Sequence, residues 1–154
     1  MILVVPFIIS RRDRDLFKIY IITYALMYIA ALITFIAYPT IMEIPPLQST
    51  DFFSSWMNFI YASDYPPINC IPSGHTMSSV VMIYGAMLCK KLKPSAKATI
   101  VIICLLTICS TVFTKQHALI DLFFGFAYTT IIFAVVLVAY RYIKLKKNRK
   151  IARR

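Results

Sequence analysis

The stretch Leu16–Tyr38, LFKIYIITYALMYIAALITFIAY, decides which kind of fold this chain adopts. Its one charged residue, Lys18, lies near the start, and as a helix the stretch is long enough to cross a hydrocarbon core of about 30 Å. The whole chain of 154 residues is 60% apolar and has a mean hydropathy of +0.74. A water-soluble domain does not tolerate that much apolar surface, so we expect an integral membrane protein.

Further apolar segments follow the first one. Their lengths and helical spacing predict one long helix over residues 118–142 and two short helices over residues 76–89 and 98–113. An amphipathic helix at the membrane interface is predicted over residues 52–61. Short helices can begin below the bilayer surface where their ends line a polar cavity. We therefore predict a single all-α domain over residues 1–154. It would be a polytopic transmembrane helix bundle of about four spanning helices plus an N-terminal apolar stub (1–10), the interfacial helix and a basic cytoplasmic tail (143–154).

The formal net charge of +11 is concentrated in three clusters outside the apolar segments. These clusters run from Arg11 to Arg14, from Lys90 to Lys97 and from Arg141 to Arg154. The positive-inside rule predicts that all three lie in the cytoplasm. The alternation of the helices then places the two histidines of the chain, His75 and His117, on the same outer face. We expect no nucleic-acid binding, because no aromatic residues interleave with the basic ones to stack on bases.

The tetrapeptide Pro72-Ser73-Gly74-His75 stands where a proline-rich loop enters one of the short helices. The N–H groups at a helix N-terminus, together with the positive end of the helix dipole, favour an anion. Glycine lets a ligand approach the backbone closely, and serine adds a hydroxyl donor. This pattern is typical of a phosphate site.

A second polar stretch runs from Ser110 to Asp121 and includes Lys115 and His117. The spacing of four residues predicts that His117 and Asp121 share one helical face. A carboxylate beside an imidazole fixes its tautomer and raises its basicity, as a histidine nucleophile requires. Two alternatives remain open: Asp121 could serve only as an acid at a helix N-terminus, and Lys115 could only extend to the membrane interface.

These two stretches resemble the second and third signature motifs of the type 2 phosphatidic acid phosphatase and haloperoxidase superfamily. The motifs are Pro-Ser-Gly-His, and Ser-Arg followed by five residues, His, three residues and Asp. The runs 61–72 and 114–117 also resemble the membrane branch that includes inositol phosphorylceramide synthases. The sequence departs from the pattern at two places. Thr111 replaces the arginine of the third motif, and Ile44-Pro45-Pro46 stands where the first motif has Arg-Pro.

The resemblance implies a mechanism without a metal ion or another cofactor, and no cluster in the sequence has metal-ligand spacing. His117 would attack phosphorus to give a phosphohistidine, Asp121 would orient His117, and His75 would protonate the departing oxygen. The resemblance implies that Ser73 and Gly74 bind the phosphate oxygens. Lys115, in place of the missing arginine, and Ser110 are further candidates for phosphate binding, with the alternative that Ser110 is only a hydroxyl within a helix.

Three functions fit these observations. The first is a lipid phosphatase that hydrolyses a phosphate monoester or diphosphate of a lipid at the extracytoplasmic face of the plasma (inner) membrane. The second is a phosphotransferase of the inositol phosphorylceramide synthase type, in which an alcohol intercepts the same intermediate. The third is a degenerate, non-catalytic relative, which the missing arginines favour. A lipid phosphate and the bilayer are the expected partners, and the pattern makes no prediction of oligomeric state.

Overall fold

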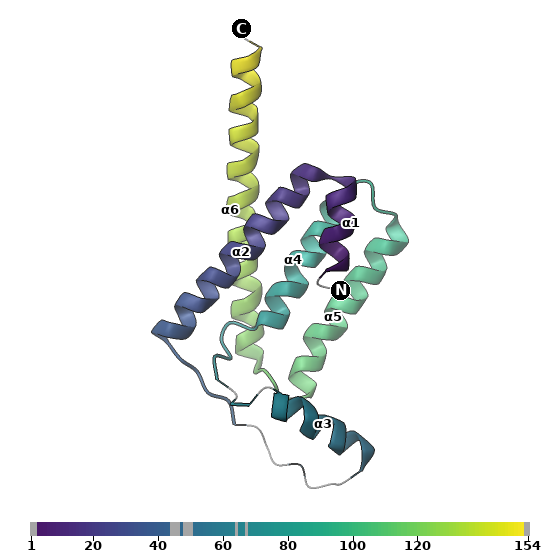
Figure 1. The fold of residues 1–154 in the computed structure, drawn as a ribbon, viewed down its shortest axis with the longest axis vertical. Coiled ribbons are helices and arrows are strands. Elements are labelled where there is room, and N and C mark those ends of the chain that lie inside the picture. The colour runs from purple at the N-terminus through teal and green to yellow at the C-terminus, as the bar shows by residue number, and fades with distance from the viewer. Residues whose placement is uncertain (1–2, 44–46, 48–50, 64, 67, 153–154) are drawn as a thin grey trace.

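The computed structural model describes residues 3–43, 47, 51–63, 65–66 and 68–152, which form an all-α bundle (Figure 1). Its helices are α1 (Val4–Arg12), α2 (Arg14–Ala37), α3 (Phe52–Ser63), α4 (Gly74–Leu88), α5 (Pro94–Phe113) and α6 (Leu119–Ile151). Outside the helices, an isolated antiparallel bridge joins Ile41 to Ile68. The predicted helical bundle is confirmed. The residues at which the first family motif was sought, Ile44 to Pro46, lie outside the described ranges.

Three helices of the described chain, α2, α5 and α6, are long and apolar enough to cross a membrane. In their most apolar windows only 28%, 17% and 22% of the residues are buried inside the protein. Large apolar side chains such as Ile33, Leu106 and Val138 are more than 60% exposed. A bilayer is the environment that covers an apolar surface of this extent, so the chain is an integral membrane protein.

The short helix α4 lies at the centre of the bundle and packs against α1, α2, α5 and α6. It has 15 residues, so it is about 22 Å long and shorter than the hydrocarbon core of about 30 Å. Most of its residues are buried, including the hydroxyl-bearing Thr76, Ser78 and Ser79. A helix surrounded by other helices can carry polar side chains that a lipid-facing helix cannot. This central position explains how polar residues are kept at membrane depth.

Two predicted helix boundaries were wrong. Helix α5 begins at Pro94 instead of residue 98. Proline is favourable in the first turn, because a backbone N–H at that position would have no hydrogen-bond partner within the helix. Helix α6 continues to Ile151, so most of the predicted basic tail is helical, consistent with the high helix propensity of lysine and arginine. The N-terminal stub is a short helix, α1, which buries Val5 and Ile9.

The three basic clusters gather at one end of the bundle. The guanidinium of Arg12 donates to the carbonyl oxygen of Lys91 at 2.6 Å, which joins the first cluster to the second. Lys144 pairs with Asp15, and Tyr140 donates to the same carboxylate at 2.9 Å, which brings the third cluster to this end. The helix order in Figure 1 places the start of α4 and the start of α6 at the opposite end. The predicted separation between the basic residues and the histidines is confirmed.

Helix α3 lies at the same end as the histidines, near the end of α5 (Figure 1). None of its residues is buried, and the side chains of Phe52, Phe53, Trp56 and Phe59 are at least half exposed. The hydroxyl of Tyr61 donates to the carbonyl oxygen of Thr114 at 2.9 Å. The helix predicted over residues 52–61 is therefore confirmed, and it is attached to the loop that precedes α6.

Candidate active site

The two histidines meet at the end of the bundle that is remote from the basic clusters. The ring centroids of His75 and His117 lie 5.8 Å apart, with the ring planes inclined at 66°. His75 is the second residue of α4, whereas His117 belongs to the loop between α5 and α6. The expectation that two residues far apart in sequence would share one end of the molecule is thus confirmed.

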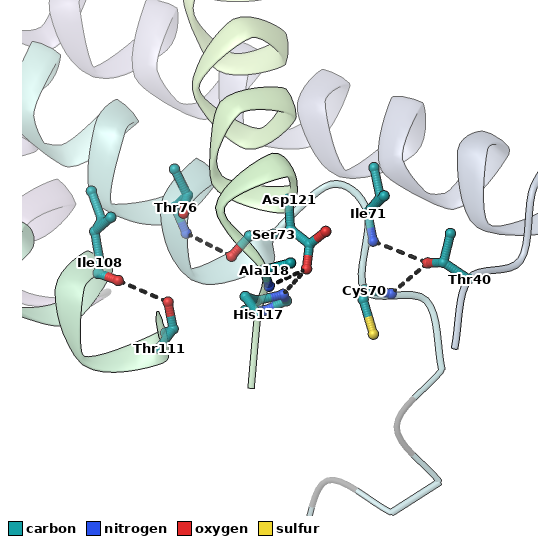
Figure 2. Close-up of polar contacts among 10 residues, drawn as sticks. All are labelled: Thr40, Cys70, Ile71, Ser73, Thr76, Ile108, Thr111, His117, Ala118 and Asp121. Carbon is teal, nitrogen blue, oxygen red and sulfur yellow. Dashed lines mark hydrogen bonds and ion pairs between the residues drawn. The ribbon is translucent and has the colours of Figure 1, made fainter. Parts of the chain in front are cut away.

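Ser73 fixes the start of α4. It is fully buried and is the N-cap residue, and its Oγ accepts a hydrogen bond from the N–H of Thr76 at 3.3 Å (Figure 2). The first bond of the helix itself joins the N–H of Met77 to the carbonyl oxygen of Ser73. The N–H groups of Gly74 and His75 precede that bond, so the helix ladder does not use them. They are placed where backbone donors for an anion are expected.

The loop that carries His117 is a Schellman motif at the end of α5. Lys115 adopts a left-handed conformation with φ of 53°, and its N–H donates to the carbonyl oxygen of Val112 at 3.0 Å. The N–H groups of Gln116 and His117 both donate to the carbonyl oxygen of Thr111, at 2.9 and 3.1 Å. These are the bonds that commonly close a helix C-terminus, although the left-handed residue is usually glycine. The backbone of His117 is therefore anchored to α5.

Asp121 joins the imidazole of His117 to the start of α6. Its Oδ2 lies 3.2 Å from Nδ1 of His117 and accepts a hydrogen bond from the N–H of Ala118 at 2.9 Å (Figure 2). The prediction that His117 and Asp121 share a helical face was wrong, because His117 precedes the helix. The carboxylate reaches back to the residues before α6 as a capping group does. Asp121 thus caps the helix and contacts the histidine at once.

This contact determines which nitrogen of His117 can react. The side chain of His117 is 12% exposed and that of Asp121 is 3% exposed. A buried carboxylate favours a proton on the Nδ1 that faces it, and the neutral ring then carries its lone pair on Nε2. The geometry therefore suits a nucleophile or base that acts through Nε2.

The start of α4 and the start of α6 are held together by backbone contact. The N–H of Ser73 donates to the carbonyl oxygen of Asp121 at 3.1 Å. A Cβ placed on Gly125, one turn further along α6, would lie 2.9 Å from the carbonyl oxygen of Ser73 and 3.0 Å from Cβ of Thr76. Only glycine allows this approach. Sequence analysis missed Gly125, although a glycine inside an apolar helix often marks a close contact.

The segment before Ser73 is attached to the residues that follow α2. The Oγ1 of Thr40 accepts hydrogen bonds from the N–H groups of Cys70 and Ile71, at 2.9 and 3.2 Å (Figure 2). Burial raises the pKa of the Cys70 thiol, and the nearby charge of Asp121 raises it further. This thiol therefore stays protonated at neutral pH. Thr40 was also missed, because an isolated threonine in a loop gives no signal of its partner.

The remaining predicted residues are placed differently. Ser110 is exposed, and its hydroxyl donates to the carbonyl oxygen of Thr107 at 2.8 Å. Lys115 is exposed on the loop beside His117. Thr111, at the position of the family arginine, is buried, and its hydroxyl donates to the carbonyl oxygen of Ile108 at 2.8 Å (Figure 2). Among the described residues, no three His, Cys, Asp or Glu side chains form a group that could hold a metal ion.

The two helix starts differ in charge, which indicates where an anion would bind. The first turn of α6 contains the carboxylate of Asp121, whereas the first turn of α4 contains no acidic residue. The positive end of the α6 dipole is therefore largely neutralised by its own side chain, and that of α4 is not. An anion between the two imidazoles would be attracted to the backbone of Gly74 and His75.

Comparison with known proteins bears on the same residues. No curated protein and no solved structure is a match for the chain. Residues 14–145 match the family model of the PAP2 superfamily, a range that includes both histidines and Asp121. The matched range covers most of the sequence, from the start of α2 into the last turns of α6. The chain belongs to the PAP2 superfamily.

Proposed function

We propose that this protein is a membrane lipid phosphatase that hydrolyses a phosphate monoester or diphosphate of a lipid through a phosphohistidine on His117. PAP2 superfamily members are typically phosphatases or phosphotransferases that act on phosphate esters. The observation that carries the proposal is the distance of 5.8 Å between the two imidazole rings, with the carboxylate of Asp121 behind one of them. Reacting atoms approach to roughly 3–3.5 Å, so a single phosphate ester can contact both rings.

The first step forms one bond and breaks another. Nε2 of His117 attacks phosphorus while the bond from phosphorus to the lipid oxygen breaks, and His75 donates a proton to that oxygen. Asp121 stabilises the positive charge that develops on His117. In the second step water attacks the phosphohistidine, His75 takes a proton from the water, and inorganic phosphate and the starting enzyme are released.

The phosphate oxygens would be bound mainly by the start of α4. The N–H groups of Gly74 and His75 precede the helix ladder, and the hydroxyl of Ser73 keeps its own proton for donation while its oxygen accepts from Thr76. Fixed donors of this kind stabilise charge that develops in a transition state. Lys115 would add a cation from the adjacent loop, and Ser110 would need to leave its bond to Thr107 to contribute.

The charge distribution supports an orientation in the membrane. The basic clusters gather at one end of the bundle, and the positive-inside rule places that end in the cytoplasm. The site would then lie at the extracytoplasmic face of a plasma (inner) membrane. A lipid phosphate could reach it directly from the outer leaflet.

The test uses the purified full chain, labelled lipid phosphate and the variant His117→Ala. We expect release of inorganic phosphate and a loss of at least about a thousandfold in turnover on substitution. Reactions quenched with denaturant at alkaline pH, where the N–P bond of a phosphohistidine is stable, should carry the phosphate label on the unsubstituted protein and not on the variant. Turnover that survives the substitution, or that is absent from the parent chain as well, would overturn the proposal.

Adding a candidate alcohol acceptor completes the test. A phosphatase releases phosphate whether or not the alcohol is present. Transfer of the label to the alcohol in preference to water would replace the phosphatase assignment with a phosphotransferase. Label on the protein would remain in both cases, because the two reactions share the phosphohistidine.

A further inference from the structure

A cavity of about 660 Å³ lies beside His75 and extends into the bundle. One side of α4 lines it from His75 through Ser78 to Met82, and Tyr28 of α2 faces this stripe. Leu3, Val4, Ser79 and Thr107 also line it, and of these Leu3 and Val4 are more than half exposed. This volume falls within the range of roughly 300–1,000 Å³ that is typical of small-molecule sites.

Along α4 the lining changes from the polar Ser78 and Ser79 to the apolar Met82 with distance from His75. Ser78 lies three residues beyond His75, about 4.5 Å along the helix, and Met82 lies about 10 Å along it. The hydroxyls of Tyr28 and Ser78 are hydrogen-bonded at 2.8 Å, and either can be the donor. The Tyr28 hydroxyl also lies 3.7 Å from the position that a Cβ on Gly74 would occupy. Along α4, the hydroxyl pair therefore stands between the proposed phosphate position and the apolar Met82.

This order matches one class of lipid phosphate. In a glycerolipid or sphingolipid phosphate, an ester carbonyl, an amide or a hydroxyl follows the phosphate within a few bonds, and hydrocarbon comes after it. In a prenyl phosphate, hydrocarbon begins at once. Because either hydroxyl of the pair can donate, the pair can offer a proton to a carbonyl or accept one from a hydroxyl or an amide.

We infer that Tyr28 and Ser78 form a specificity site that selects lipid phosphates with a hydrogen-bonding group on the carbons next to the phosphate. This inference rests on the proposed function and narrows its substrate class. The two hydroxyls satisfy each other when no partner is present, so a prenyl phosphate is disfavoured but not excluded.

The test compares three substrates of the full chain: a phosphatidic acid, a ceramide 1-phosphate and geranylgeranyl monophosphate. We expect kcat/KM for at least one of the first two to exceed that for the prenyl phosphate by about three- to tenfold, the value of one hydrogen bond. Comparing the first two separates a glycerolipid source from a sphingolipid source. Equal values for all three, or preference for the prenyl phosphate, would overturn the inference.

Variants assign the preference to the hydroxyl pair. Tyr28→Phe and Ser78→Ala should each remove the preference by lowering turnover of the favoured lipid, with prenyl turnover unchanged. The matched control is Tyr128→Phe, which removes a bond of the same kind, from Tyr128 to Thr34 at 2.8 Å, and should leave the preference intact. An equal fall for all three lipids in both cavity variants would indicate a structural role and overturn the assignment.

A binding measurement separates failure of this inference from failure of the proposed function. The His117→Ala chain is heated with each of the three lipids, and the shift in its unfolding temperature reports binding without turnover. Absence of turnover by the parent chain would reject the proposed function alone. The inference would still stand if the glycerolipid or sphingolipid gave the larger shift and Tyr28→Phe removed the difference. It would fail if the three shifts were equal.

Discussion

Helices α4 and α6 both begin at the candidate site, but their first turns differ in charge and in the groups that they contact. The first turn of α6 contains Asp121, whose carboxylate accepts from the N–H of Ala118 and contacts His117. The first turn of α4 has no acidic residue, and its N-cap is the neutral Ser73. One helix start is therefore occupied by its own side chain and positions a histidine. The N–H groups of Gly74 and His75 at the other helix start precede the helix ladder, where backbone donors for an anion are expected.

Among the substitutions that test the difference between the two helix starts, His75→Ala is expected to have the largest effect on turnover. Loss of a general acid should reduce turnover of a lipid phosphate by about 10²–10⁴-fold. A substrate with a good leaving group, such as a nitrophenyl phosphate ester, needs no proton on the departing oxygen. Its turnover should be reduced far less.

The same pair of substrates distinguishes His75 from His117. The His117→Ala chain should lose turnover of both substrates, because no nucleophile remains. If His75→Ala lowers turnover of both substrates equally, His75 is not the general acid. The two helix starts would then not have the different roles proposed for them.

The next effect is expected from Asp121→Asn at the start of α6. An amide oxygen can still accept from the N–H of Ala118, so the unfolding temperature should change little. The charge that orients and stabilises the imidazole of His117 is lost, and kcat should fall by about a hundredfold, as for other orienting partners of histidine. Asp121→Ala should in addition destabilise the fold by about 0.5–2 kcal/mol, because the cap is lost. An active Asn variant would reduce Asp121 to a capping role.

Gly125→Ala tests whether the two helix starts must touch. The added Cβ would overlap the carbonyl oxygen of Ser73, and overpacking of this kind destabilises by about 1–3 kcal/mol. Turnover should fall as well, because the overlap would push the start of α6 away from α4, and Asp121 would move with it. Gly74→Ala is the matched control for stability, since its Cβ would be 3.7 Å from the Tyr28 hydroxyl, an ordinary contact. Equal unfolding temperatures for the two variants would contradict the proposed close approach.

The smallest effect is expected at Lys115, in the loop that holds His117. Glycine adopts φ of 53° without the penalty that a side chain brings, so Lys115→Gly should stabilise the fold by about 1 kcal/mol. If the ammonium binds phosphate, KM should rise by up to about fivefold, the value of an exposed ion pair. Lys115→Arg should retain the lower KM. An unchanged KM in the glycine variant would leave Lys115 with only an interfacial role.

Much of this arrangement could be predicted from local pattern. Runs such as Leu16–Tyr38 exceed the thickness of a hydrocarbon core, which made the all-α membrane bundle a consequence of length and hydropathy alone. The charge clusters predicted that His75 and His117 would share one end, because each crossing reverses the direction of the chain. The spacing of the two motifs predicted a relation between the histidines and Asp121.

Other features depend on contacts between distant segments. The sequence by itself determined the class of fold, the end of the molecule that carries the histidines and the residue types of the site. Tertiary structure alone decided that the rings of His75 and His117 lie 5.8 Å apart, that Gly125 lets α6 touch Ser73, and that Tyr28 meets Ser78 in a cavity. The physical reason is that hydropathy and charge act along the chain, where a pattern can be read. A hydrogen bond or a close backbone approach exists only once two helices have fixed their distance and rotation.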